Sequence, residues 1–425
     1  MRRELLALAA LLVLSACGSA RPTSPPDNLA CGLDAYVVKD TLAELHVYAA
    51  RRAAVRPSQR TEVNMLELSA GGEFGSYGAG FLIGWGNVGL SASPVARDDI
   101  QIVTGVSTGA LMATYAFLGK NDDKLKTFYL TLNDAQIYSQ RFLSLLWANS
   151  LFDVTGKQKL LRDNITTETI DAVARQPDTR GLFIGMANLD SGRFVRIDMK
   201  KLARGNFAST ARRDDCYRAI IDAATAIEVL FPPVFIDGNM YGDGGVRQHV
   251  FLVSPNLVLP DGVDMSNVDL RMITLVHGDL GVSDETPGKA GATGVKNGVL
   301  YIAQRASSIF TDQVLKSSLR LANALAVDPE SVVGRKEARR LPHFKPFYAA
   351  AAGAACQCRM LEEVQKQCID STSADIFCQP YMECLEQKGE EDGARAASTG
   401  KWLEITDLPL GTDPVCALRM RPKFR

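Results

Sequence analysis

The stretch DIQIVTGVSTGAL, residues 99–111, decides the fold, because it passes from a strand pattern to a helix pattern through a serine. Its β-branched and apolar start predicts a buried strand, and TGALMATYAFLG, residues 108–119, predicts a helix. Ser107 lies at the junction, with Gly105 and Gly109 two positions to either side. A nucleophile elbow needs small residues at those two positions, because its strained turn has no room for side chains. Taken alone, this common pattern fits an ordinary strand-to-helix turn equally well.

A second unit of the same kind comes earlier in the chain. NMLELSAGG, residues 64–72, predicts a short buried strand running into glycines, and SYGAGFLIGWGNVG, residues 76–89, predicts a helix rich in small residues. Two strand–turn–helix units in series indicate α/β architecture with a parallel sheet. Further strands are expected on either side of the turn at 190–192 and within residues 268–278, whereas helical patterns dominate after about residue 295.

The glycines between the first strand and its helix can form an anion site. In the run from Ser69 to Gly75, backbone N–H groups can point into a cavity beside a helix N-terminus, which favours a phosphate or a developing oxyanion. The phosphate version is a dinucleotide site, which needs an acidic residue after the second strand. Asp98 and Asp99 precede that strand, so the dinucleotide site is excluded.

An Asp-Gly-Gly motif follows much later, at Asp243. Asp237, Asn239 and Asp243 alternate at a spacing typical of calcium ligands. A calcium loop would then need a polar ligand at Tyr241 and a bidentate glutamate at Gln248, so it is excluded. A hairpin turn, which Asp-Gly-Gly also favours, stays open for the motif alone.

The order of the three motifs is more specific than any one of them. A glycine-rich loop, then Gly-x-Ser-x-Gly, then a late Asp-Gly-Gly resembles the patatin-like phospholipase family. AATAIEVLFPPVFIDGNMYGDGGV, residues 223–246, and MANLDSGRFVRID, residues 186–198, are also similar to segments of that family. The resemblance covers roughly residues 63–280. It implies a three-layer α/β/α fold with a mainly parallel central sheet.

The resemblance also implies a catalytic constellation. Ser107 would be the nucleophile and Asp243 the general base, and the backbone N–H groups of Gly71 and Gly72 would form the oxyanion hole. The remaining motif glycines are Gly75, Gly105, Gly109, Gly244 and Gly245. The implied reaction is hydrolysis of a lipid acyl ester through an acyl-enzyme, as in phospholipases A and lysophospholipases, with no cofactor and no metal ion.

Two positions depart from the family pattern. Ala70 replaces the first of the family's three glycines, and Phe74 stands where many members carry Arg or Lys. That cation does not donate the oxyanion N–H groups, so its loss leaves the oxyanion hole intact and can alter head-group preference.

Two alternatives remain open from the sequence. A Ser–Asp–His triad would draw on His46, His249, His277 or His343, although the motif context favours the dyad. A non-catalytic surface lipoprotein with the same fold would bind lipid or a protein partner, because a fold does not by itself imply a function.

The first residues predict export. Arg2 and Arg3 precede the apolar run Leu5–Leu14, which is typical of a secretory signal and too short to cross a bilayer. The end of this signal resembles the bacterial lipoprotein box, which implies a signal peptide over residues 1–16 and lipidation of Cys17. The alternative is a plain signal peptide cleaved near the same place. Gly18 rather than Asp follows the cysteine, which in lipoproteins indicates a lipid-anchored location in the cell envelope, at the outer membrane.

The remainder divides into three expected parts. Residues 17–60 would form a lipidated tether and an N-terminal helix, residues 61–335 the hydrolase domain, and residues 336–425 a helical, cysteine-rich C-terminal extension. The eight cysteines other than Cys17 are an even number, which in an exported protein favours disulfides over a zinc site. Six of them lie in the extension: Cys356, Cys358, Cys368, Cys378, Cys384 and Cys416. The formal net charge of −1 gives no general attraction to nucleic acid.

Overall fold

The structure is a computed structural model, and it describes most of the chain. The described residues are 28–56, 58–88, 95–119, 122–131, 139–140, 152–228, 230–250, 259, 261–278, 280, 299–369, 377–408 and 410. The predicted signal peptide, the lipidation site Cys17 and the cysteine at 416 lie outside these residues.

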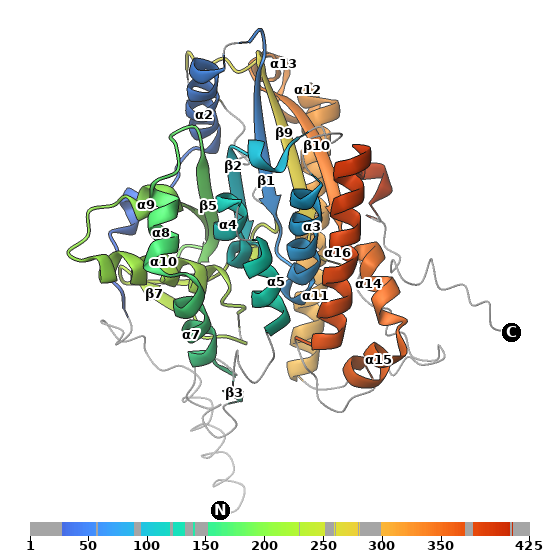
Figure 1. The fold of residues 1–425 in the computed structure, drawn as a ribbon. Helices are drawn as coiled ribbons and strands as arrows, with labels where there is room; N and C mark the ends of the chain where they lie inside the picture. Colours follow the sequence, from blue (N-terminus) through green and yellow to red (C-terminus); the bar gives the residue numbers. More distant parts are fainter. Residues whose placement is uncertain are drawn as a thin grey trace, which may run out of the picture.

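A mixed, mostly parallel sheet of eight strands forms the centre of the described part (Figure 1). Its strand order is β10 (His343–Ala350), β9 (Val268–Val276), β1 (Thr61–Leu68), β2 (Ile102–Val106), β5 (Gly181–Asn188), β8 (Asn239–Asp243) and β7 (Val234–Ile236), with β6 (Arg193–Asp198) also paired to β5. The strands from β10 to β5 run parallel to one another. β6, β7 and β8 form antiparallel pairs, and β3 (Ser139–Gln140) pairs with β4 (Phe152–Asp153) in a separate ribbon.

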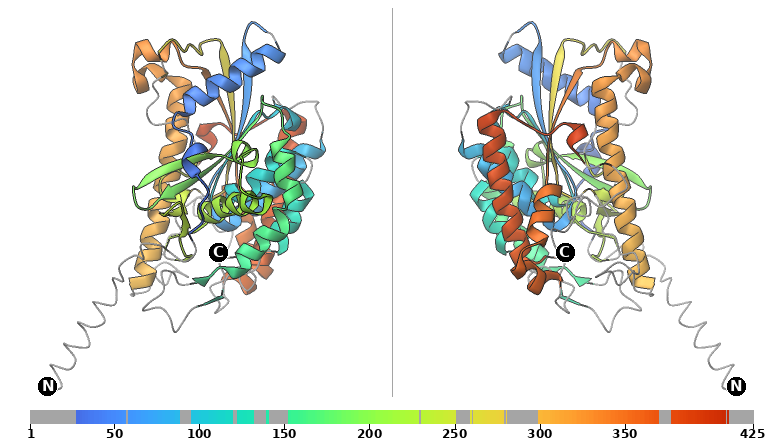
Figure 2. Two further views of the ribbon diagram at one scale, coloured as in Figure 1. Left: turned by 90° about the vertical axis from the view of Figure 1, so that its left-hand side faces the viewer. Right: turned by 90° about the vertical axis from the view of Figure 1, so that its right-hand side faces the viewer.

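Helices cover both faces of the sheet, as the two side views in Figure 2 show. One face carries α3 (Gly75–Asn87), α4 (Thr108–Leu118), α5 (Asp122–Thr131), α7 (Thr155–Asn164), α8 (Thr167–Ala174), α9 (Met199–Ala203), α10 (Thr210–Ala224), α14 (Ala352–Arg359), α15 (Glu362–Val364) and α16 (Gln379–Thr399). The other face carries α2 (Thr41–Val55) and α11 (Val299–Val327), which leads into the short helices α12 (Pro329–Val333) and α13 (Arg335–Ala338). The expected three-layer α/β/α arrangement is therefore confirmed.

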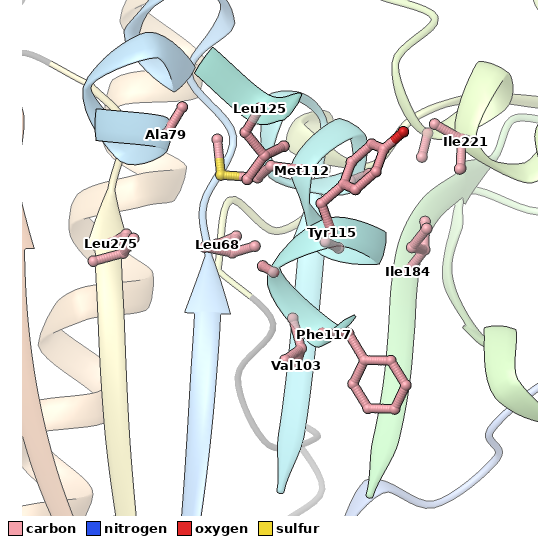
Figure 3. Packing of buried hydrophobic residues seen from close by; sticks show 14 of the residues in the cluster. Leu68, Ala79, Val103, Met112, Tyr115, Phe117, Leu125, Ile184, Ile221 and Leu275 are labelled. Atoms are coloured by element: carbon pink, nitrogen blue, oxygen red, sulfur yellow. The ribbon is translucent and has the colours of Figure 1, made fainter. Parts of the chain in front are cut away.

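The apolar core between the sheet and α4 explains why residues 99–111 form a buried strand followed by a helix. In Figure 3, Leu275, Leu68, Val103 and Ile184 mark four neighbouring strands, and α4 lies over them. Met112, Tyr115 and Phe117 of α4 are all buried. A helix that is apolar on every side needs cover all round, and the sheet supplies it on one side and α3, α5 and α8 on the others. Each such side chain contributes about 1.5–3 kcal/mol by its burial.

The strands and helices expected around the motifs are all present. β1 and α3 form the first unit, β2 and α4 the second, and β5 and β6 flank the turn at 190–192. β9 occupies the strand expected within residues 268–278.

Helices dominate the described residues after 295, as expected, but the strand β10 among them was not expected. This strand extends the sheet parallel to β9, although its sequence, HFKPFYAA, contains Pro346. Proline cannot donate to a strand ladder, so it indicates a loop in a sequence pattern and is tolerated at a sheet edge. β10 is the edge strand, which is why the structure accepts it. The boundary predicted at 335/336 thus falls before a strand of the central sheet.

Disulfides join the C-terminal helices to one another and the N-terminal segment to the sheet domain. Among the described residues, Cys358 pairs with Cys384 and Cys368 with Cys378, and a third bond joins Cys31 to Cys216 on α10. Cys356 is disulfide-bonded as well. The prediction of disulfides is confirmed for these seven cysteines. Within the described ranges, no helix has the length and apolar composition needed to cross a bilayer.

Candidate active site

Ser107 occupies a strained turn between β2 and α4. Its backbone angles are φ 53° and ψ −124°, a region that residues with a side chain rarely adopt. The carbonyl of Ser107 already accepts a hydrogen bond from the N–H of Ala110 at 2.8 Å, so the serine caps the first turn of α4. The side chain therefore lies at the positive end of a helix. This is the geometry of a nucleophile elbow.

The glycines on either side of Ser107 are required by close backbone contacts. A Cβ on Gly105 would lie 2.4 Å from the carbonyl oxygen of Gly109. A Cβ on Gly109 would lie 2.1 Å from the carbonyl oxygen of Leu68, at the end of β1. Neither neighbour is a flexible side chain, so both positions exclude every other residue. The Gly-x-Ser-x-Gly pattern thus reflects packing of the elbow against the neighbouring strand.

Asp243 reaches Ser107 across β5, the strand that lies between β2 and β8. It is the last residue of β8, which pairs antiparallel with β5, and Met186 of β5 is its register partner. Ser107 Oγ donates a hydrogen bond of 2.6 Å to Asp243 Oδ2. The N–H of Gly245 donates one of 2.7 Å to Oδ1, and Gly244 begins the short 3₁₀ turn, η4 (Gly244–Val246), that follows. The late Asp-Gly-Gly therefore orients a carboxylate and is not a hairpin turn.

The environment of Asp243 tunes its pKa toward neutrality. Burial raises the pKa of Asp243 from its ordinary value to about 6, because a charged carboxylate loses hydration there. Hydrogen bonds from Ser107 and from the Gly245 N–H, together with the charge of Lys157, act in the opposite direction. At pH 7 the group is still mostly a carboxylate, and its pKa is close to that of an effective general base.

A second acid, the half-buried Glu228, lies beside this site. Its Oε1 approaches Gly242, since a Cβ built there would lie 2.7 Å from that atom. Burial, and then the charge of Asp243, raises the pKa of Glu228 to about 8. The neutral form is therefore favoured more strongly at Glu228 than at Asp243. Nothing in the sequence pattern singles out Glu228 beyond its place before Phe231-Pro-Pro.

The predicted oxyanion loop lies against the end of β9. Gly71 packs on the carbonyl of His277, where a Cβ would come within 1.5 Å of the oxygen. Gly72 adopts φ 57°, in the left-handed region that favours glycine, and it lines the same pocket as Ser107. Gly75 begins α3 against the side chains of Thr108 and Tyr129.

In the described part of the chain, neither His249 nor His277 makes a hydrogen bond to Ser107 or Asp243. The ring Nδ1 of His277 lies 2.8 Å from the carbonyl oxygen of Ser69, and its backbone N–H donates to Ser69 Oγ. His249 is buried beside Gly245, and both of its ring nitrogens lack a hydrogen-bond partner among the described residues. Burial lowers the pKa of each imidazole to about 4, so both are neutral at pH 7. The triad alternative has no supporting contact in the part of the chain that the structure describes.

Ser107 opens into an apolar pocket of about 500 Å³, including its solvent-open part. The lining residues are Gly72, Ser107, Thr108, Leu111, Lys157, Leu160, Leu161, Thr225, Ile227, Phe231 and Phe377. The apolar character of this lining suits a hydrocarbon chain.

Lys157 is the charged residue that the sequence did not reveal. It is 6% exposed, and its Nζ lies 2.7 Å from Asp222 Oδ1 and 3.1 Å from the carbonyl oxygen of Asp222. It also lies 5.2 Å from the ring centroid of Phe231. α7 thus brings a buried cation into the wall of the pocket, while the family's usual cation position holds Phe74.

Comparison with known proteins relates part of the chain to one family. Residues 66–253 match the family model described as patatin-like phospholipase, a stretch that includes Ser107, Asp243 and the glycine loop. No curated protein matches the chain. A solved structure, the crystal structure of VipD from Legionella pneumophila, is similar over 80% of this chain and 67% of its own, with 12% sequence identity and a TM-score of 0.35. A similarity at this TM-score decides neither function nor substrate.

Proposed function

We propose that this chain, which carries a patatin-like phospholipase domain over residues 66–253, is a membrane-anchored serine hydrolase of lipid acyl esters. The observation that supports this most directly is the 2.6 Å hydrogen bond from Ser107 Oγ to Asp243 Oδ2, formed at a strained turn that opens into an apolar pocket. A nucleophile within hydrogen-bond reach of a base is the arrangement that covalent catalysis needs.

The first half of the reaction forms an acyl-enzyme. Ser107 Oγ attacks the ester carbonyl while Asp243 takes its proton, and the carbonyl oxygen becomes an oxyanion held by the N–H groups of Gly71 and Gly72. The tetrahedral intermediate then collapses, the bond to the alcohol oxygen breaks, and that oxygen takes the proton back from Asp243. The alcohol leaves, and the acyl group stays on Ser107.

The second half repeats these steps with water. Asp243 removes a proton from the attacking water, a second tetrahedral oxyanion forms in the same hole, and its collapse returns a proton to Ser107 Oγ. The fatty acid leaves and the free enzyme is restored. Since a lone carboxylate is a weak base, the oxyanion donors carry much of the rate, at about 3 kcal/mol each.

Hydrolysis by active-site variants tests this mechanism. Ser107→Ala and Asp243→Asn should each lower kcat/KM on a panel of phospholipid, lysophospholipid, neutral lipid and simple acyl esters by at least about a thousandfold. His249→Ala and His277→Ala are the matched controls and should retain most activity. Loss of activity in a folded His277→Ala protein would contradict the Ser–Asp dyad.

Labelling with a fluorophosphonate separates an enzyme from a lipid-binding protein of the same fold. The wild-type protein should take the label at Ser107, and Ser107→Ala should not. A folded wild-type protein that remains unlabelled would favour the non-catalytic lipoprotein.

The anchor is a separate part of the proposal, and it rests on the sequence around Cys17. We expect acylation at Cys17 to hold the protein at the bacterial envelope, where lipid substrate is available. Metabolic labelling with palmitate should mark the wild type, and Cys17→Ser should lose the label and move to the soluble fraction. Labelling that persists in Cys17→Ser would refute the anchor and leave the catalytic proposal standing.

A further inference from the structure

We propose that Phe377, in the C-terminal extension, is the residue that sets the acyl-chain preference of the pocket. This inference rests on the proposed acyl hydrolase function. It gives that function a substrate class, namely esters of medium to long hydrocarbon chains whose length is limited by the Phe377 ring, which we call the aromatic wall. Phe377 lies outside the stretch that matches the family model, so the wall belongs to this chain and not to the shared domain.

The first observation is the place of Phe377 in the pocket. Five of the other lining residues have large apolar side chains, all from the hydrolase domain: Leu111, Leu160, Leu161, Ile227 and Phe231. Phe377 closes the same pocket as Ser107 and is itself half-buried. An apolar side chain in the lining of the nucleophile's own pocket lies where the acyl chain of an acylated Ser107 would be held.

The second observation is that covalent bonds hold Phe377 in place. The next residue, Cys378, is the N-cap of α16 and is bonded to Cys368. One turn and a half further along α16, Cys384 is bonded to Cys358 of α14. The backbone at Phe377 is therefore fixed by two cross-links close to it, which a general surface loop would not need.

The third observation is a close helix crossing that sets the position of α16. Gly80 and Gly84 of α3 face Gly389 and Gly393 of α16, and the two helices lie side by side in Figure 1. A Cβ on Gly80 would lie 1.9 Å from the Glu386 carbonyl oxygen, and one on Gly389 would lie 2.0 Å from that of Tyr77. Backbones in such contact can neither slide nor rotate freely, so α16 has one register on α3.

The crossing of α3 and α16 connects Phe377 to the predicted oxyanion loop. α3 begins at Gly75, directly after the oxyanion glycines. Phe74, at the start of this helix, packs edge-on against Tyr381 in the first turn of α16, with ring centroids 6.1 Å apart. The loop that would hold the oxyanion and the residue that closes the pocket are thus tied to the same pair of helices. A residue that selects acyl chains by length needs such a fixed distance between itself and the oxyanion glycines.

Chain-length profiles of two variants test the proposal. With p-nitrophenyl esters from two to sixteen carbons, Phe377→Ala should lower kcat/KM for the best wild-type chain by about tenfold, mainly through KM, and move the optimum to longer chains. Phe377→Trp should move it to shorter chains. Phe310→Ala, an exposed phenylalanine on α11, is the matched control and should keep the wild-type profile. A folded Phe377→Ala enzyme with the wild-type profile would overturn the proposal.

A binding measurement separates this proposal from the proposed function. Calorimetry of octanoate and palmitate on full-length Ser107→Ala needs no catalysis. Because removal of the aromatic ring leaves room for longer chains, adding Phe377→Ala to that background should raise the affinity for palmitate relative to that for octanoate by about tenfold, whereas adding Phe310→Ala should leave this ratio unchanged. If the wild type hydrolyses no ester but this difference in binding is found, the proposed hydrolase function is contradicted and the proposed role of Phe377 is still supported. An unchanged ratio of palmitate to octanoate affinity in Phe377→Ala would overturn the proposed role of Phe377, whatever the activity.

Discussion

Asp243 must satisfy two opposing requirements as a single residue. A catalytic base has to be ionised, whereas a buried carboxyl group resists ionisation. Its pKa of about 6 is the balance that burial and two hydrogen bonds produce. Activity and stability should therefore respond to pH in opposite directions.

The activity should rise with pH as Asp243 ionises. Only the carboxylate form accepts the proton of Ser107, so kcat/KM should increase about tenfold per pH unit below pH 6 and level off above it. A pH profile on a soluble ester measures this. If the rise of kcat/KM below pH 6, the acidic limb of the profile, is unchanged in His249→Ala and His277→Ala, the ionisation belongs to Asp243. Loss of this limb in either variant would contradict that assignment.

The stability should fall over the same pH range. The folded-state pKa of Asp243 lies above the unfolded value, so its contribution is complete below pH 3.8 and is lost as pH rises through about 6. Asp243→Asn keeps the shape without the charge. It should match the wild type near pH 3.5 and exceed it at pH 8 by up to about 3 kcal/mol of unfolding free energy. Urea titrations at the two pH values measure the difference, and an equal gain at both would contradict this cause.

Lys157 offers a residue-scale test of the buried ion pair. Lys157→Met leaves Asp222, which is 5% exposed, without its cation, and should cost about 3–5 kcal/mol of unfolding free energy. Because the charge of Lys157 lowers the pKa of Asp243, the variant should also move the pH–activity limb upward. Lys157→Met/Asp222→Asn is the matched control and should recover most of the stability. Urea denaturation of the two proteins compares them, and equal stability would exclude a coupled pair.

At the scale of elements, the crossing of α3 and α16 should reverse the usual effect of replacing a helical glycine by alanine. Gly→Ala inside an open helix stabilises by about 1 kcal/mol. Gly80→Ala and Gly389→Ala should instead destabilise by about 1–3 kcal/mol, because each methyl group would enter the facing backbone. Ser398→Ala on the exposed side of α16 is the control and should change little. Thermal unfolding of the three variants gives the sign, and a stabilised Gly80→Ala would refute the close contact.

The elements divide clearly into those that local sequence predicts and those that it does not. β1, β2, α3 and α4 were predictable, because buried strands and small-residue helices carry their own patterns and glycines mark the turns between them. β10 was not, because Pro346 indicates a loop unless the strand is known to lie at an edge, and only the assembled sheet reveals its edge.

For the whole molecule, the sequence located the motifs but not the pocket. Ser107 and Asp243 were recognisable from motif order, and the structure places them in contact, while their catalytic roles stay predictions. Lys157, Glu228 and Phe377 carry no local signal. They reach the site because α7, the segment after α10 and the disulfide-linked extension come together there. The spacing of residues in a sequence does not reveal such long-range contacts.

The disulfide between Cys31 and Cys216 gives the last prediction at this scale, because it joins the N-terminal segment to α10 across 185 residues. The same segment donates backbone hydrogen bonds from Cys31 and Leu33 to Asp237, in the turn between β7 and β8, and β8 ends at Asp243. Cross-linking so long a loop restricts the unfolded chain strongly.

Replacing both cysteines, Cys31→Ser/Cys216→Ser, should lower the unfolding free energy by about 2–5 kcal/mol. Esterase activity at 25 °C should persist, because neither cysteine lines the pocket and Asp237 still holds the segment. Asp237→Ala/Cys31→Ser/Cys216→Ser also removes the carboxylate and leaves the segment held by backbone bonds of Leu29 to Phe235 and Asp237. It should lower kcat as well, since the β7–β8 turn that leads to Asp243 is then held more weakly. Calorimetry and ester hydrolysis on the two variants measure these effects. A large loss of activity in the cysteine variant alone would mean that the covalent bond, and not Asp237, positions β8.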